Sequence, residues 1–110
     1  IESAMGLVNS GKLTPIEMVK KLCWNPSLML GLENKGHLSK GADADITVIN
    51  PDTGMASMAF VMGKMIMKDG EVMGKSGRLL TTLAGEASAY NSGLEYEIIN
   101  MEITRLYEKF

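Results

Sequence analysis

A charged segment punctuated by glycines, running directly into β-branched residues, constrains the fold of this chain more than any other feature. It covers residues 35–49, where Gly36 and Gly41 precede the run Asp45-Ile46-Thr47-Val48-Ile49. Glycine suits turns because it adopts backbone angles that other residues avoid, whereas β-branched residues favour strands. The apolar spacing also changes here, from a helical period towards an alternating one. The segment therefore predicts a boundary between a helical region and a sheet.

Turn signals alternate with short apolar segments beyond this boundary. The expected turns are Asn50-Pro51-Asp52-Thr53-Gly54, Gly63-Lys64 and Asp69-Gly70, the last typical of a hairpin. Together with the strand at 45–49, further strands are expected at 59–62, 65–67 and 71–73. We therefore expect an antiparallel meander, which buries one face and needs a cover.

Helical signals precede the boundary. Residues 1–8 carry apolar side chains at helical spacing. Thr14-Pro15-Ile16-Glu17 combines a capping box with proline at the first helical position, so a second helix is expected to begin there. The apolar face of this helix comprises Ile16, Val19, Leu22 and Cys23. Pro26 is expected to end it by biasing Asn25 away from helical geometry, and a short helix over 27–30 follows.

The C-terminal part is expected to be helical as well. Ser92-x-x-Glu95 fits a second capping box, and the helix that it opens would carry an apolar stripe of Ile99, Ile103, Leu106 and Phe110. Residues 79–83 fit either a strand or the entry to a helix. The predicted fold class is α+β, with helices at both ends around a small antiparallel β meander.

Composition excludes several functions. The formal net charge is −2 and no basic cluster is present, which argues against nucleic-acid binding. No apolar run is long enough to span a bilayer and no signal peptide is visible, so we expect a cytoplasmic protein without a membrane partner. The single Cys23 excludes an internal disulfide and is expected as a buried thiol. Six of the ten methionines lie within residues 55–73, which fits either flexible core filler or an adaptable surface.

Residues that could carry catalysis are sparse. His37 is the only histidine, and because a metal centre needs several ligands, it is interpreted as a turn residue. Asp43 and Asp45 point to the same side of an extended chain and could form a metal or acid/base pair. Alternatively, Asp43 stabilises the turn through backbone hydrogen bonds and Asp45 starts the strand. Gly74-Lys75-Ser76 lacks the upstream glycine of a phosphate-binding loop. We therefore assign no catalytic, cofactor-binding or metal-ligating residue.

Three segments in this order resemble the C-terminal end of the cyclic amidohydrolases, the group of dihydroorotases, hydantoinases and allantoinases within the amidohydrolase superfamily. The segments are Ile1-Glu2-Ser3-Ala4-Met5 with Gly11-Lys12-Leu13-Thr14, then Asn25-Pro26-Ser27-Leu28-Met29-Leu30-Gly31-Leu32, then Lys35-Gly36-His37-Leu38 with Gly41-Ala42-Asp43-Ala44-Asp45-Ile46. A weaker similarity joins residues 61–64 to 69–72. The resemblance covers about residues 1–80 and ends there.

This resemblance implies a metal-dependent hydrolase of cyclic amides, built as a (β/α)₈ barrel with a small β-sandwich. Residues 1–35 would be helices at the end of the barrel and 36–80 a β-sandwich segment. Residues 81–110, which the resemblance does not cover, are expected to form a C-terminal helical extension. Glu2 and Ser3 could border the substrate mouth. Zinc or a similar divalent metal is expected in the full-length parent, with its ligands upstream of Ile1, and none in this chain. A C-terminal fragment of this kind would be inactive alone.

A different interpretation is a stand-alone binding or oligomerisation module derived from the same fold. Its interface would be the methionine-rich strands and the C-terminal helix. Under the first interpretation the partner is the barrel of the parent chain, and in its absence strand edges and the apolar stripe would drive self-association. A reading frame that continues upstream into a His-x-His motif would favour the enzyme, and a start codon near Ile1 would favour the module.

Overall fold

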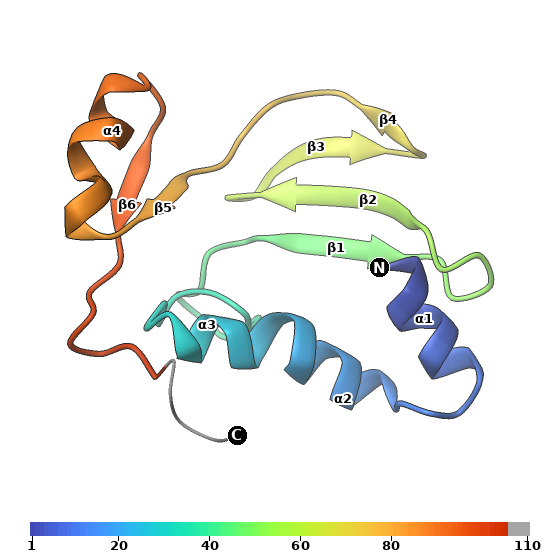
Figure 1. Cartoon of the computed structure of the whole chain (residues 1–110). Helices are drawn as coiled ribbons and strands as arrows, with labels where there is room; N and C mark the ends of the chain where they lie inside the picture. Colours follow the sequence, from blue (N-terminus) through green and yellow to red (C-terminus); the bar gives the residue numbers. More distant parts are fainter. Residues whose placement is uncertain (106–110) are drawn as a thin grey trace.

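The computed structural model describes residues 1–105 as an α+β chain, which confirms the predicted fold class (Figure 1). The helices are α1 (Glu2–Asn9), α2 (Pro15–Val19), a π-helical turn (Lys20–Trp24), α3 (Asn25–Met29), a 3₁₀ turn (Leu83–Gly85) and α4 (Glu86–Asn91). The strands are β1 (Ile46–Ile49), β2 (Ala56–Val61), β3 (Lys64–Lys68), β4 (Glu71–Val72), β5 (Leu79–Thr81) and β6 (Tyr96–Ile98). Figure 1 shows α1 to α3 on the β1 side of the meander, with α4, β5 and β6 at one end.

The predicted meander is confirmed. Four strands pair antiparallel in the order β1-β2-β3-β4. The β3–β4 connection is the expected Asp69-Gly70, with φ of 49° and 80°. Positive φ at both central positions matches the right-handed twist of the flanking strands. The β2–β3 connection is Met62-Gly63, one residue earlier than predicted, because Lys64 already pairs with Val61.

Pro26 does not end the second helix, so the predicted break between that helix and a separate short helix over 27–30 is wrong. Asn25 has helical angles, φ −62° and ψ −46°, and helical structure continues from Pro15 to Met29. The Asn25 N–H donates to the carbonyl of Lys20, five residues back. This π turn shifts the hydrogen-bond register just before the proline, which has no N–H to donate. The outcome is one rod, α2–α3.

The predicted helix beginning at Ser92 is also wrong. Ser92 lies at the C-terminal end of α4, where its hydroxyl donates to the Ala89 carbonyl at 2.6 Å. Gly93, with φ 71°, then reverses the chain, and Tyr96–Ile98 forms β6 parallel to β5. Leu106 and Phe110 of the predicted stripe lie outside the described residues. The ambiguous residues 79–83 form β5 and the start of the 3₁₀ turn.

The hydrophobic core is small. Among residues 1–105 the buried hydrophobic side chains are Met5, Met18 and Ala89. The accessible surface is 8110 Å², against about 5900 Å² expected for a compact monomer of this mass. The radius of gyration is 15.7 Å, against about 13 Å expected. Apolar surface that a compact domain would bury is therefore exposed.

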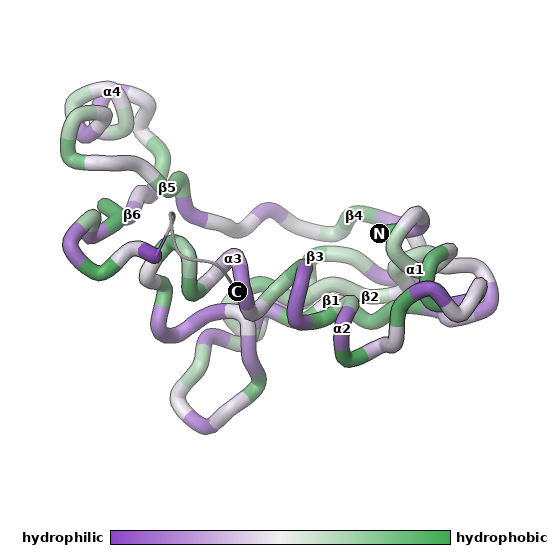
Figure 2. Tube along the Cα trace, turned by 60° about the horizontal axis from the view of Figure 1, so that its bottom comes forward, coloured by the Kyte–Doolittle hydropathy of each residue, from purple (hydrophilic) through white to green (hydrophobic). Residues whose placement is uncertain are grey.

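Part of that exposed surface lies on the α2–α3 rod. Ile16 is 71% exposed, and its predicted neighbours on the apolar face, Val19 and Leu22, are about half exposed. Cys23 is exposed rather than buried, which contradicts the expected thiol environment. The methionines of residues 55–73 fit neither interpretation alone, since Met55, Met62 and Met73 are exposed and Met58, Met65 and Met67 are half-buried. Figure 2 shows apolar stretches along the meander and the helices beside it, with the α4 end set apart.

Candidate functional site

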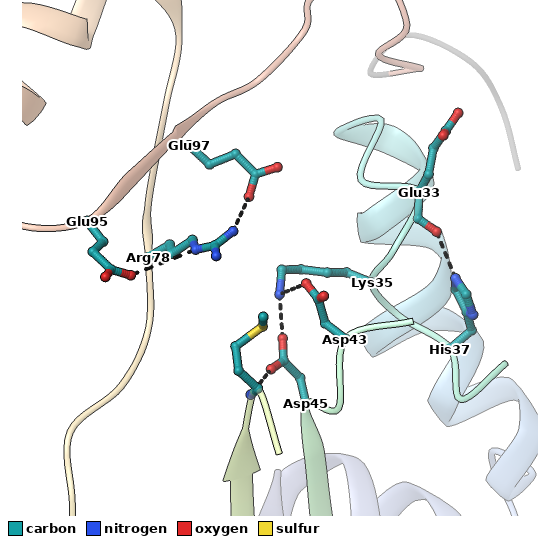
Figure 3. Close-up of polar contacts among 9 residues, drawn as sticks. Glu33, Lys35, His37, Asp43, Asp45, Arg78, Glu95 and Glu97 are labelled. Atoms are coloured by element: carbon teal, nitrogen blue, oxygen red, sulfur yellow. Dashed lines mark hydrogen bonds and ion pairs between the residues drawn. The ribbon is translucent and has the colours of Figure 1, made fainter. Parts of the chain in front are cut away.

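Three charged side chains from the segment between α3 and β1 converge on one another (Figure 3). The Lys35 Nζ lies 2.9 Å from Asp43 Oδ2 and 2.6 Å from Asp45 Oδ2. The three side chains are partly shielded from water, with exposed fractions of 25%, 22% and 35% in that order. We refer to Lys35, Asp43 and Asp45 as the lysine clasp. It closes the loop that precedes the meander.

The clasp also holds the β2–β3 turn. The second oxygen of Asp45, Oδ1, accepts the Met62 N–H at 2.8 Å. Beside it, the Gly63 N–H donates to the Ala44 carbonyl at 2.9 Å. Met62 has φ 50°, which is unfavourable for a residue with a Cβ atom, and these two bonds hold the turn in that conformation. Asp45 therefore joins Lys35 to the far end of β2.

The charges of the clasp stabilise one another. Hydrogen bonding to Lys35, assisted by the Met62 N–H, lowers the pKa of Asp45 below its usual value despite partial burial. Partial burial disfavours the charge of Lys35, but its contacts with Asp45 and Asp43 outweigh this effect and raise the pKa of Lys35. Lys35 and Asp45 are therefore both ionised near neutral pH, and the two aspartates face a shared cation and do not form an acid/base pair.

Gly36 allows the clasp loop to lie against the helical rod. A Cβ atom at this position would approach the Cys23 carbonyl oxygen and the Ser27 Oγ to 2.5 Å. Its φ of 80° is also in the region that glycine favours. The Lys35-Gly36 pair thus combines a cation for the clasp with the residue that permits close packing beside it.

His37 lies in the same loop and has local partners. Its Nε2 is 2.8 Å from the Glu33 carbonyl, and its Nδ1 accepts the Ser39 N–H at 3.3 Å. The imidazole meets the Trp24 indole edge to face, with ring centroids 5.6 Å apart. These contacts give His37 the turn role that the sequence indicated.

The expected hydrogen-bond partners of Asp43 need correction. In place of backbone hydrogen bonds to the Asp43 side chain, the structure shows the ion pair with Lys35. The pairing partner was missed because Lys35 is ten residues from Asp45, too far for a local rule. The available signal was the same-side spacing of Asp43 and Asp45, which suits one shared cation.

Two cavities flank the clasp, with volumes of about 410 Å³ and 260 Å³. Both are lined by Lys35 and Arg78. The larger adds Asp45 and Glu95, and the smaller adds Asp43 and Glu97. Arg78 lies 3.9 Å from Glu95 and 3.8 Å from Glu97, which are loose ion pairs (Figure 3). Carboxylates equal the cations around the larger cavity and outnumber them around the smaller, where Glu33 adds a third carboxylate, so neither cavity has the excess of positive charge that an anionic ligand needs.

The described part of the chain does not assemble a metal centre. Within residues 1–105 there is no group of three or more His, Cys, Asp or Glu side chains that could hold a metal ion. Glu2 and Ser3 lie exposed at the start of α1, and Gly74-Lys75-Ser76 lies in the connection from β4 to β5. No helix within residues 1–105 is long and apolar enough to cross a membrane. The lysine clasp is thus the candidate polar site of residues 1–105, and it acts by holding the loop before β1 and the β2–β3 turn in place.

Comparison with known proteins identifies related sequences. The profile of the "Amidohydrolase family" matches residues 2–77. The dihydroorotase of Pelotomaculum thermopropionicum is 49% identical over 57 residues, covering 47% of this chain and 13% of that protein. Protein FwdA of Methanocaldococcus jannaschii is 33% identical over 100 residues, covering 86% of this chain and 18% of that protein.

A third relative belongs to the formyltransferase/hydrolase complex Fhc of Methylorubrum extorquens. This component of the complex is 33% identical over 61 residues, with 56% of this chain and 11% of that protein covered. The chain therefore spans less than a fifth of the length of each of these relatives. No solved structure matches it.

Proposed function

This chain belongs to the amidohydrolase family, and on that basis we propose that it forms the C-terminal part of a metal-dependent hydrolase that opens a cyclic amide. The observation that carries the proposal is the coincidence of the family match, residues 2–77, with the three sequence segments and with the clasp that the third of them builds. The dihydroorotase relatives, at about half identity over their matched stretches, support the cyclic amide as the substrate class.

The role proposed for this region is structural support. Residues 1–35 would close a barrel, 36–80 would contribute to a β-sandwich and 81–110 would form an appendage. The exposed Ile16, Val19 and Leu22 of the rod support this assignment, because they leave an apolar face for a barrel to cover. The residues of the chain do not fit a catalytic metal site within 1–105, so zinc or a similar divalent ion would be held elsewhere in a longer protein.

The test is an assay of the longest protein encoded by the reading frame that contains this chain. We expect that protein, supplied with zinc, to hydrolyse dihydroorotate or a related cyclic amide, and we expect the 110-residue chain alone to bind no zinc stoichiometrically. Inactivity of the zinc-loaded long protein towards every cyclic amide would contradict the proposed substrate class. A reading frame that starts near Ile1 would replace the enzyme with the binding or oligomerisation module.

Chain coverage favours a second candidate function. The FwdA match covers 86% of this chain. The residues that it leaves out are fewer than those that follow residue 77, so the match extends into β5 and α4. The family profile stops before both. The Fhc relative is named as part of a formyltransferase/hydrolase complex. The second candidate is therefore a component of such a formyltransferase/hydrolase complex, and the same assay with a formylated compound as substrate separates the two.

We propose that a partner binds this chain by covering the exposed apolar face of the α2–α3 rod. In a longer protein the barrel would cover it, and in the isolated chain a second copy would. Sizing chromatography with light scattering at micromolar concentration is expected to give a mass above 11.9 kDa. Replacing Val19 with glutamate should restore the monomer, and a clean monomer of the unmodified chain would refute self-association.

A further inference from the structure

The β5–α4–β6 segment, residues 79–98, forms a separate βαβ unit at one end of the molecule (Figures 1 and 2). Within residues 1–105 its sheet consists of β5 and β6 alone, paired in parallel. Parallel sheets normally contain more strands and are covered on both faces. This pair therefore offers strand edges to which a further strand can be added.

The hydrogen bonds of the pair define its outer edge. The Leu79 N–H donates to the Glu95 carbonyl at 2.8 Å, and the Ile99 N–H donates to the Thr81 carbonyl at 2.7 Å. Backbone groups alternate in direction along a strand, so those of Glu95, Glu97 and Ile99 face β5. The N–H and C=O groups of Tyr96 and Ile98 consequently face away from β5, in register for another strand.

The charged side chains of this unit are all negative. Residues 79–104 contain four glutamates, Glu86, Glu95, Glu97 and Glu102, and no lysine or arginine. The Glu95 side chain is 82% exposed and the Glu97 side chain 41% exposed, and both pair only loosely with Arg78. Two residues apart on a strand, they project to one face. Apolar side chains flank them, with Leu94 63% exposed and Ile98 36% exposed.

We propose that the outer edge of β6 binds an extended strand of a second protein that carries lysine or arginine at alternate positions. Main-chain bonds to Tyr96 and Ile98 would supply affinity, and alternate basic side chains would pair with Glu95 and Glu97. A second copy of this chain is disfavoured as the occupant, because pairing two β6 edges would bring acidic side chains together. The proposal goes beyond the proposed hydrolase function and does not depend on it.

The probe is a short fluorescent peptide of alternating lysine and valine, titrated with the full chain and followed by anisotropy. We expect the lysine peptide to bind and a matched glutamate–valine peptide not to bind. Exchanging Glu95 and Glu97 for glutamine should weaken binding about three- to tenfold, the range expected for two exposed ion pairs. A lysine peptide N-methylated on its bonding edge should lose binding, and the amides of Tyr96 and Ile98 should exchange more slowly when the unmodified peptide is bound.

A matched pair of proline variants identifies the edge. Ile98→Pro blocks the outer edge of β6, whereas Leu80→Pro blocks the outer edge of β5, and neither position donates a bond between the two strands. We expect only Ile98→Pro to abolish binding. Equal binding of the glutamate peptide, or of the N-methylated peptide, would overturn the proposal by showing non-specific adsorption. Dissociation of a dimer by Ile98→Pro would also overturn it, because the occupant would then be a second copy.

Discussion

Residues 46–72 and residues 79–98 both form small sheets, but their strands pair in opposite ways. In the meander, consecutive strands are antiparallel and tight turns such as Asp69-Gly70 connect them. In the βαβ unit, the two strands are parallel and α4 separates them in the sequence. The meander is also tied to the preceding loop by the lysine clasp, whereas Arg78, directly before β5, makes only loose pairs with Glu95 and Glu97 at β6.

This comparison shows that the meander is ordered by interactions that the βαβ unit does not have. Local turn chemistry sets the register of the meander, and a charged cluster with direct hydrogen bonds anchors it. The βαβ unit lacks both, and the family match ends at residue 77, between the two regions. Changes at the clasp loop should therefore destabilise the meander and leave the unit nearly unchanged. The predictions below test this independence.

The largest effect is expected for Gly36→Ala. The new Cβ would meet the Cys23 carbonyl oxygen and the Ser27 Oγ at 2.5 Å, in a backbone conformation with φ 80°. We expect a loss of about 2–4 kcal/mol of unfolding free energy, from overpacking and backbone strain together. Amide exchange measured by mass spectrometry should accelerate in the meander and not in the βαβ unit.

Gly41→Ala is the matched control. Gly41 has φ 90°, but a Cβ atom there would meet nothing within 4 Å. It should cost only the backbone strain, about 1 kcal/mol. Equal losses for the two variants would show that Gly36 serves the turn alone and that the loop does not pack on the rod.

The same contrast explains what the sequence could predict. Asp69-Gly70 and Thr14-Pro15-Ile16-Glu17 were interpretable because each sets its structure through neighbours a few residues away. Ser92 misled because one serine can cap either end of a helix, and Gly93 with its positive φ decides for the C-terminal end. The parallel pairing of β5 with β6 depends on residues far apart in the sequence, and no local pattern encodes it.

The candidate site was predictable to the same extent. The Lys35-Gly36 and Asp43-Ala44-Asp45 segments stood out as a pattern, but the pattern did not reveal that a lysine joins the aspartates. The bond from Met62 to Asp45 spans 17 residues and required the folded meander. Likewise, the continuity of the rod through Pro26 depends on a π turn, which single-residue propensities do not predict.

Two substitutions of Asp45 separate its roles in the clasp. Asp45→Ala removes both the ion pair with Lys35 and the acceptor for the Met62 N–H. We expect a loss of about 2 kcal/mol in urea unfolding, because the Met62 N–H loses its acceptor and Lys35 loses one of its two carboxylate partners. Asp45→Asn keeps an amide oxygen for Met62 and should cost about 1 kcal/mol. Identical losses would show that the bond to Met62 does not stabilise the turn.

The stability of the clasp should depend on pH at both extremes. Since hydrogen bonding to Lys35 lowers the pKa of Asp45 below 3.8, its contribution is present above that pH and lost as pH falls through the folded-state pKa. The pKa of Lys35 is raised above 10.5 by its carboxylate partners, so its contribution is present below that pH and lost as pH rises through the folded-state pKa.

The loss of unfolding free energy at low pH (the acid limb of the profile) and the loss at high pH (the basic limb) should each be less than about 1 kcal/mol, because the groups remain partly exposed. Urea unfolding monitored across pH should therefore show a plateau between the two limbs. In Asp45→Asn the acid limb should be reduced, while other carboxylates of the chain continue to titrate. An acid limb of unchanged size in that variant would indicate that Asp45 is not stabilised by Lys35.

The smallest effect is expected at the link between the two regions. Arg78 lies 3.9 Å from Glu95 and 3.8 Å from Glu97, and its side chain is 45% exposed. Exposed pairs at such distances contribute little, so Arg78→Gln should change the unfolding free energy by less than about 0.5 kcal/mol, and added salt should erase the difference. Lys35→Gln, which removes the much closer contacts of the clasp, should cost several times more. If the two variants cost the same, the loose pairs that Arg78 makes at β6 stabilise the chain as much as the clasp does, and the meander is not the more firmly anchored of the two regions.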